Sequence, residues 1–296
     1  MNCQELIRLL TPLHGAGEAR AIVRLLMEER FGLSQTDLLL GRDEGLSPSD
    51  HRDFEQLADR LLQGEPVQHV LGYEYFCGHR FSVSPSVLIP RPETEELVGH
   101  ALKLLEGMKH PQNPSSPLHI LDLCTGSGCI AISVALAYPE AKVTALDIST
   151  EALTVARQNA ADLEARNVTF LQHDILQSDG FLKDAVSSPA EETRFHLLLS
   201  NPPYVRDSEA AEMSPTVLDH EPHLALFVPD EDPLRFYRAI ATIGRQTLVP
   251  GGYILLEINA SLSRDTLRLF ADSGFTDLSI LPDQFTRPRF LRGRLQ

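Results

Sequence analysis

The stretch LDLCTGSGCIA, residues 121–131, passes from an apolar run through a turn with two glycines into a second apolar run. The first run is typical of a buried strand and the second of a helix, so the stretch predicts a strand–turn–helix unit. Gly126 and Gly128 would let the backbone approach a ligand closely, and the helix start would present free N–H groups to an anionic group. This turn is the first candidate binding site.

Strands and helices alternate around this turn, from residue 118 to the end of the chain. We expect strands at 118–123, 141–148, 168–174, 195–200 and 252–259, and helices at 128–137, 149–165, 233–248 and 263–274. Such alternation predicts an α/β fold with a mostly parallel, doubly wound sheet that helices cover on both faces. Residues 287–296 are expected to form a last, antiparallel edge strand, where alternating arginines would discourage aggregation.

The chain before the sheet predicts two smaller parts. Residues 1–69 have apolar residues at three- and four-residue spacing, which predicts a small helical domain for substrate docking. Residues 70–90 carry aromatic and β-branched residues around Cys77 and Gly78, which predicts a β-hairpin linker. Residues 91–296 would then form the sheet domain.

Local signals add detail to this division. Ser47 is a good N-cap for a helix in the first domain, and Pro92 with the acids after it predicts a helix start after the hairpin. Two interpretations stay open for the charged residues Arg91, Glu93 and Glu95. They either help to order a substrate loop or only form a solvated helix start. Residues 109–117 and 179–194 predict surface connections.

The composition argues against several classes of protein. The 296 residues include 26 Lys and Arg against 41 Asp and Glu, and the net charge of −15 speaks against specific binding of nucleic acid through its phosphates. No apolar run approaches the roughly 18 residues that a membrane-spanning helix needs, and the start lacks a signal-peptide pattern. The four cysteines form neither a CxxC pair nor a zinc spacing, so we expect a cytoplasmic protein with reduced thiols and no metal site.

An acidic residue follows the glycine turn at a spacing that is typical of nucleotide-binding folds. Asp147 lies 21 positions after Gly126, at the end of the next expected strand. A carboxylate there can accept hydrogen bonds from both ribose hydroxyls, so the pair predicts a nucleotide-type crevice. Residues 126–131 also match the G-x-G-x-x-A dinucleotide fingerprint, which leaves a nicotinamide-dependent oxidoreductase open at this point.

The tetrapeptide Asn201-Pro202-Pro203-Tyr204 follows the buried run FHLLLS, at the strand end where open α/β sheets bind ligands. The Asn201 carbonyl and the backbone carbonyl of Pro202 could each accept one N–H of an –NH₂ group. This would aim the poorly nucleophilic nitrogen at an electrophile and favour the positive charge that grows during attack. The prolines stiffen the stretch, and Tyr204 offers a flat face for stacking.

These features together resemble a known family. The order of glycine turn, two acids after strands and NPPY is similar to class I S-adenosylmethionine-dependent methyltransferases. More narrowly, the chain resembles the N5-glutamine methyltransferases of peptide chain release factors, the HemK/PrmC family. The matching stretches are LGYEYFCGHRFSV, LIPRPETEE, LDLCTGSG, ALDIS, HDI, NPPYV, HEPHLAL and LLEI. The resemblance implies a Rossmann-like class I methyltransferase sheet, with an antiparallel last strand, behind a small N-terminal helical domain.

The resemblance also implies which residues bind. The methionine part of S-adenosylmethionine would lie against Cys124, Thr125, Gly126, Ser127 and Gly128. Asp147 would hold the ribose hydroxyls, and Asp174 and Ile175 would lie by the adenine. Asn201 would touch both cofactor and substrate, and the substrate glutamine would be held by Asn201, Pro202, Pro203 and Tyr204, with Asn201, Pro202 and Tyr204 acting in catalysis.

Two positions depart from the family pattern. Cys124 and Thr286 stand where many members have glycine, so any positive φ at Cys124 would be strained, and the geometry of the last hairpin around Thr286 stays open.

The resemblance implies methyl transfer from S-adenosylmethionine to the glutamine of the Gly-Gly-Gln motif of release factors, by direct displacement and without a metal. Two alternatives stay open. One is a glutamine methyltransferase of a ribosomal protein, and the other is an adenine-N6 methyltransferase of nucleic acid, against which the acidic composition speaks.

Overall fold

The computed structural model describes residues 1–108, 117–177 and 194–296. The chain forms two compact units. One comprises Met1–Tyr73 with Met213–Glu221, and the other comprises Glu74–Glu212 with Pro222–Gln296. The surface connections predicted at 109–117 and 179–194 lie, apart from their last residues, outside the described part of the chain.

The first unit is helical, as its apolar spacing predicts. Its helices are α1 (Cys3–Phe31), α2 (Gln35–Leu39), α3 (Pro48–Leu62), α4 (Val67–Leu71) and α9 (Pro215–His220), with the 3-10 turn η1 (Arg42–Gly45). α1 is bent at Gly15, whose φ of 78° interrupts the helical backbone. Ser47 caps α3 by accepting a hydrogen bond from the Asp50 N–H. The core includes Leu6, Leu10, Leu26, Met27 and Phe54.

The second unit is built on a seven-stranded sheet in the order β10-β11-β9-β6-β3-β4-β5. The strands are β3 (His119–Leu123), β4 (Lys142–Asp147), β5 (Val168–Gln172), β6 (Phe195–Ser200), β9 (Leu248–Glu257), β10 (Phe275–Pro282) and β11 (Pro288–Leu295). The pairs β9–β6, β6–β3, β3–β4 and β4–β5 are parallel, whereas β11 is antiparallel to both its neighbours. This confirms the mostly parallel sheet with an antiparallel last strand.

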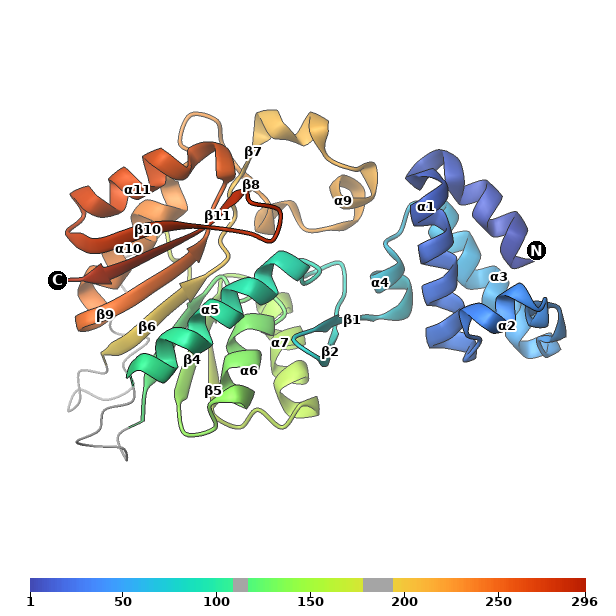
Figure 1. Cartoon of the computed structure of the whole chain (residues 1–296), viewed down its shortest axis with the longest axis horizontal. Coiled ribbons are helices and arrows are strands. Elements are labelled where there is room, and N and C mark those ends of the chain that lie inside the picture. Colours follow the sequence, from blue (N-terminus) through green and yellow to red (C-terminus); the bar gives the residue numbers. More distant parts are fainter. Residues whose placement is uncertain (109–116, 178–193) are drawn as a thin grey trace. The chain divides into compact units, whose positions relative to one another are not determined.

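Helices cover both faces of this sheet (Figure 1). On one face lie α5 (Pro92–Met108), α6 (Cys129–Ala137) and α7 (Thr150–Asp162), and on the other lie α10 (Arg235–Thr247) and α11 (Ser263–Asp272). The apolar layer of the first face includes Leu97, Ile132 and Leu199, and that of the second includes Leu198 and Ile240. Leu198 and Leu199 are therefore buried on opposite faces, which explains why the strand FHLLLS is apolar throughout.

The expected edge position of the last strand is wrong. β11 is paired on both sides, and β10, which the sequence reading left unassigned, occupies the edge instead. The stretch FTDLSILP contains polar residues, because an edge strand can expose them to solvent. The stretch therefore lacks the apolar run that is typical of a buried strand. The arginines of β11 therefore do not lie on an edge strand, where they were expected to discourage aggregation.

Shorter elements complete the second unit. The predicted hairpin is present as β1 (Tyr73–Phe76) and β2 (His79–Ser82), and its turn uses positive φ at Cys77 (49°) and Gly78 (77°). A small parallel pair, β7 (Val205–Arg206) and β8 (Phe227–Val228), accompanies the 3-10 turns η3 (Asp207–Glu212), η4 (His223–Ala225) and η5 (Ala260–Leu262). Over the described ranges, no helix has both the length and the apolar character needed to cross a membrane.

Candidate active site

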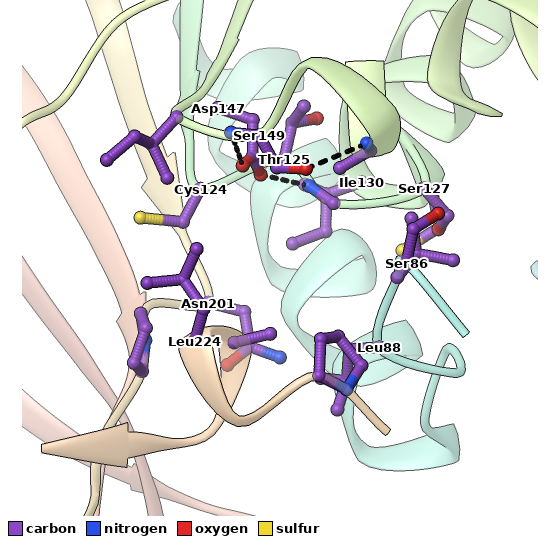
Figure 2. Close-up of a pocket in the computed structure, with 18 of the residues that line it drawn as sticks. Ser86, Leu88, Cys124, Thr125, Ser127, Ile130, Asp147, Ser149, Asn201 and Leu224 are labelled. Carbon is purple, nitrogen blue, oxygen red and sulfur yellow. Dashed lines mark hydrogen bonds between the residues drawn. The ribbon is translucent and has the colours of Figure 1, made fainter. Parts of the chain in front are cut away.

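A cavity of about 300 Å³ opens at the carboxyl ends of the parallel strands. Its walls come from the segments that follow β3, β4, β5 and β6, together with residues 86–94 and the segment around Leu224. Figure 2 shows Thr125, Asp147 and Ser149 gathered in one part of the cavity, and Asn201, Leu224 and Leu88 in another. Open α/β sheets bind ligands at this edge, so the position agrees with the predicted one.

The glycine turn after β3 is held by its own hydrogen bonds. The Thr125 N–H donates to the Leu146 carbonyl at 2.8 Å, and its hydroxyl donates to Asp122 Oδ2 at 2.6 Å. The Gly128 N–H donates to the Thr125 carbonyl at 2.9 Å. Cys124 begins the turn with a φ of 60°, so the predicted strain at this non-glycine residue is present.

The two glycines of the turn do different things. A Cβ added at Gly128 would come within 2.8 Å of Ile132 Cδ1 and 3.2 Å of Ala156 Cβ, so this glycine permits the packing of α6 against α7. A Cβ added at Gly126 would meet no protein atom within 4 Å, and Gly126 lines the cavity whereas Gly128 does not. Gly126 therefore leaves room for a ligand.

Asp147 ends β4 and faces the cavity. Its Oδ2 accepts a hydrogen bond from the Gly126 N–H at 2.8 Å, and its Oδ1 accepts one from the Ser149 N–H at 3.0 Å (Figure 2). Burial raises the pKa of the Asp147 carboxyl, and the backbone N–H donors counteract this rise. Each oxygen has a second lone pair, so the carboxylate can still accept ligand hydroxyls.

The segment after β5 brings an acid and an apolar residue to the same cavity. Asp174 accepts hydrogen bonds from the Leu176 N–H at 2.9 Å and from Gln177 Nε2 at 3.1 Å. Ile175 is 4% exposed and packs into the core. Both residues line the cavity, as does Ser127 of the glycine turn.

The NPPY segment contributes two of its four residues to the cavity lining, Asn201 and Pro203. Asn201 Nδ2 donates a hydrogen bond to Thr94 Oγ1 at 3.2 Å. Tyr204 packs against the core, and its hydroxyl donates to Glu257 Oε1 at 2.8 Å. Pro202 and Tyr204 are not among the lining residues, and the stacking and catalytic roles given to them stay predictions.

Three polar residues next to this segment were missed by the sequence reading. Thr94 donates to Glu257 Oε2 at 2.8 Å, and Arg289 Nη1 donates to the Tyr204 hydroxyl at 3.3 Å. Burial raises the pKa of Glu257, although the hydrogen bonds from Tyr204 and Thr94 and the nearby Arg289 oppose this rise. Thr94 and Glu257 lie in the stretches IPRPETEE and LLEI, which carry the family resemblance. The residue pattern of these stretches predicts a helix start and a strand, but it does not indicate that the two side chains meet.

The comparisons with known proteins give the decisive information on family. A PrmC N-terminal domain model matches residues 8–72, and a methyltransferase domain model matches residues 114–225. A release factor glutamine methyltransferase from Bacteroides thetaiotaomicron is 43% identical over 282 residues, which is 95% of this chain and 95% of that protein. A relative of the same name from Flavobacterium psychrophilum is 35% identical and covers 97% of this chain and 96% of that protein.

The chain belongs to the release factor glutamine methyltransferase family. Membership makes the protein an enzyme, a methyltransferase, and removes the nicotinamide-dependent oxidoreductase that the glycine turn alone left open. A crystal structure of a release factor-specific protein-(glutamine-N5) methyltransferase from Alicyclobacillus acidocaldarius matches with 28% identity and a TM-score of 0.42, over 73% of this chain and 99% of that chain. The assignment to the release factor glutamine methyltransferases rests on the sequence relatives.

Metal ligands are a separate question in this family member. Among the described residues, no group of three or more His, Cys, Asp or Glu side chains is placed to hold a metal ion. The metal-free reaction stays a prediction.

Proposed function

We propose that the protein transfers a methyl group from S-adenosylmethionine to the side-chain nitrogen of the glutamine in the Gly-Gly-Gln motif of peptide chain release factors. The family supports this function, and one structural observation carries it. A single cavity is lined both by a nucleoside-type carboxylate, Asp147, and by an asparagine amide, Asn201. A methyl donor and an amide nitrogen could therefore meet in one enclosed space.

The described residues fit S-adenosylmethionine as the donor. We assign its methionine part to Cys124, Thr125, Gly126, Ser127 and Gly128. The open space above Gly126 and the acceptor capacity of Asp147 support this assignment. Asp174 and Ile175 offer an acceptor and an apolar contact for a purine. When bound, S-adenosylmethionine supplies an electrophilic methyl group on a positively charged sulfur.

The chain's own contribution is to hold the glutamine amide. The Asn201 side-chain carbonyl and the Pro202 backbone carbonyl would each accept one N–H, which directs the nitrogen lone pair into the cavity and stabilises growing positive charge. Pro202 and Pro203 fix this backbone at φ near −65°. Neutral acceptors suffice for this role, and the proton would leave to water after transfer. We retain Tyr204 as the fourth substrate-binding residue, with its ring beside the glutamine.

We also propose how the chain is divided. Residues 1–69 would dock the release factor, 70–90 would link, and 91–296 would carry the reaction. The net charge of −15 supports a protein substrate over direct, specific binding of nucleic acid. Because release factors act on ribosomes, we place the enzyme in the cytoplasm.

Labelled S-adenosylmethionine and purified release factor test the proposal, with the modified residue mapped by mass spectrometry. The expected result is one methyl group on the Gly-Gly-Gln glutamine. Label only on a ribosomal protein, only on adenine, or on no glutamine contradicts it.

The variant Asn201→Ala tests the mechanism in the same assay. It should abolish turnover while weakening S-adenosylmethionine binding only moderately. Gln284 is an exposed residue with a side-chain amide, and the control variant Gln284→Ala should retain full activity. An Asn201→Ala enzyme with unchanged turnover would exclude the amide-holding role.

A further inference from the structure

A buried network of hydrogen bonds connects Asn201 to Thr94, Glu257 and Tyr204. Asn201 Nδ2 donates to Thr94 Oγ1 at 3.2 Å, and Thr94 Oγ1 donates to Glu257 Oε2 at 2.8 Å. Tyr204 donates to the other carboxylate oxygen of Glu257 at 2.8 Å. Thr94 and Glu257 are each 2% exposed, so water does not compete for these bonds.

The number of hydrogens on these groups determines which group donates in each hydrogen bond. A carboxylate has no hydrogen, so both hydroxyls that contact Glu257 must donate to it. The single hydrogen of Thr94 is then committed, and toward Asn201 the threonine oxygen can only accept. Asn201 must therefore turn its NH₂ group to Thr94 and keep its carbonyl oxygen for another partner. Within the described ranges, that carbonyl has no hydrogen-bond partner.

The positive charge of Arg289 favours the ionised form of Glu257 that this count requires. Arg289 Nη1 lies 3.9 Å from Glu257 Oε1 and also donates to the Tyr204 hydroxyl at 3.3 Å. The Arg289 side chain is 16% exposed, so its attraction to Glu257 is only weakly screened. A positive charge at this place favours the ionised carboxylate, and the burial of Glu257 opposes it.

We propose that Thr94 and Glu257 are positioning residues that set which end of the Asn201 amide faces the substrate. An asparagine side chain has nearly the same shape with its oxygen and nitrogen exchanged, so shape alone selects neither orientation. The flipped amide would present NH₂ to the substrate NH₂ and could not accept from it. Glu257 thus makes Asn201 an acceptor, acting through Thr94. This role rests on the proposed glutamine methylation and names the residues that prepare its acceptor.

The test compares Thr94→Val with Thr94→Ser, because valine has the shape of threonine and serine retains the hydroxyl. With saturating S-adenosylmethionine and purified release factor, we expect Thr94→Val to lower kcat by about 10- to 100-fold, as for a misoriented catalytic group. KM for the release factor and Kd for S-adenosylmethionine should stay within about 3-fold. Thr94→Ser should recover kcat to within about 3-fold of the unmodified enzyme.

A second variant separates orientation from direct contact, because Thr94 also lines the cavity whereas Glu257 does not. Glu257→Gln replaces one acceptor oxygen by a donor nitrogen. Thr94 can then turn its hydrogen toward Asn201, and the Asn201 amide is no longer held with its NH₂ group toward Thr94. We expect kcat to fall again, with the thermal midpoint checked for each variant. If Glu257→Gln does not fold, the Thr94 pair can still reject the positioning role, because that role requires Thr94→Val to lose kcat and Thr94→Ser to recover it.

The outcomes separate the two proposals. An unmodified enzyme that does not methylate the glutamine rejects the proposed function. An active unmodified enzyme with equal kcat in Thr94→Val rejects the positioning role. If Thr94→Val loses kcat but a folded Glu257→Gln does not, Thr94 acts by contacting the substrate or cofactor directly. That outcome also rejects the positioning role. A loss of kcat in Thr94→Val that Thr94→Ser does not restore indicates disturbed packing and has the same consequence.

Discussion

Asp122 is a carboxyl group in the centre of the sheet, directly below the glycine turn. It lies on β3 between the paired residues Ala145 of β4 and Leu199 of β6, and it is 0% exposed. Its Oδ2 accepts the Thr125 hydroxyl at 2.6 Å. Burial raises the pKa of this carboxyl to about 7, because the interior disfavours its charged form more than the hydrogen bonds favour it.

This raised pKa makes folding stability depend on pH. Below about pH 4 the carboxyl is neutral in the folded and the unfolded chain, so it costs nothing. Between about pH 4 and pH 7 the unfolded chain loses the proton and the folded chain keeps it, so stability falls as pH rises. The difference between about 7 and the ordinary value of 3.8 corresponds to about 4 kcal/mol over this range. Between pH 5 and pH 8 the expected part is about 3 kcal/mol.

Asp122→Asn removes this titration while keeping the shape of the side chain. The free energy of unfolding in urea should be measured at pH 5 and pH 8 by far-UV circular dichroism, since the chain has no tryptophan. Relative to the unmodified protein, the variant should gain about 3 kcal/mol between the two pH values, whatever its stability at either one. The control Glu231→Gln changes an exposed carboxylate and should show no such gain. A constant difference between Asp122→Asn and the unmodified protein at both pH values would refute the reasoning.

Two further predictions concern positive φ. Thr286 is exposed and has a φ of 64°, so Thr286→Gly should raise the free energy of unfolding by about 1 kcal/mol, as measured in urea, and a loss of stability would contradict this. Gly128→Ala should lower it by about 2–4 kcal/mol, because a Cβ would lie 2.8 Å from Ile132 Cδ1 at a φ of 82°. The matched Gly126→Ala should cost only about 1 kcal/mol but weaken S-adenosylmethionine binding in calorimetry, and equal effects of the two variants on stability would show that the glycines do not differ.

Much of the fold could be predicted from local sequence because local and global preferences agree there. The runs around 121–131 and 195–200 are apolar throughout, as expected for strands covered on both faces, and the structure has them at the sheet centre. Cys124 and Thr286 were suspect because glycine is usual at both positions, and both adopt positive φ, at 60° and 64°. These are properties of single residues or short segments, which a sequence displays directly.

What could not be predicted depends on contacts between distant segments. β10 at the edge has too mixed a pattern to be recognised without its partner. Arg289 was interpreted as one of several edge arginines, yet its side chain is 16% exposed and lies beside Glu257. Thr94 and Glu257 are 163 residues apart, and their hydrogen bond follows only from the packing of α5 against the end of β9.

The order of the strands connects the local sequence motifs with the contacts between distant segments. β6 and β9 are parallel neighbours, and Ser200 is paired with Leu256. Parallel neighbours run toward the same edge of the sheet, so the next residue on each strand lies at that edge. These residues are Asn201, directly after β6, and Glu257, the last residue of β9. Once β9 is placed beside β6, the acid of LLEI is therefore fixed next to the asparagine of NPPY, before any side-chain contact is considered. The choice of Thr94 as the group between them is the step that requires the three-dimensional structure.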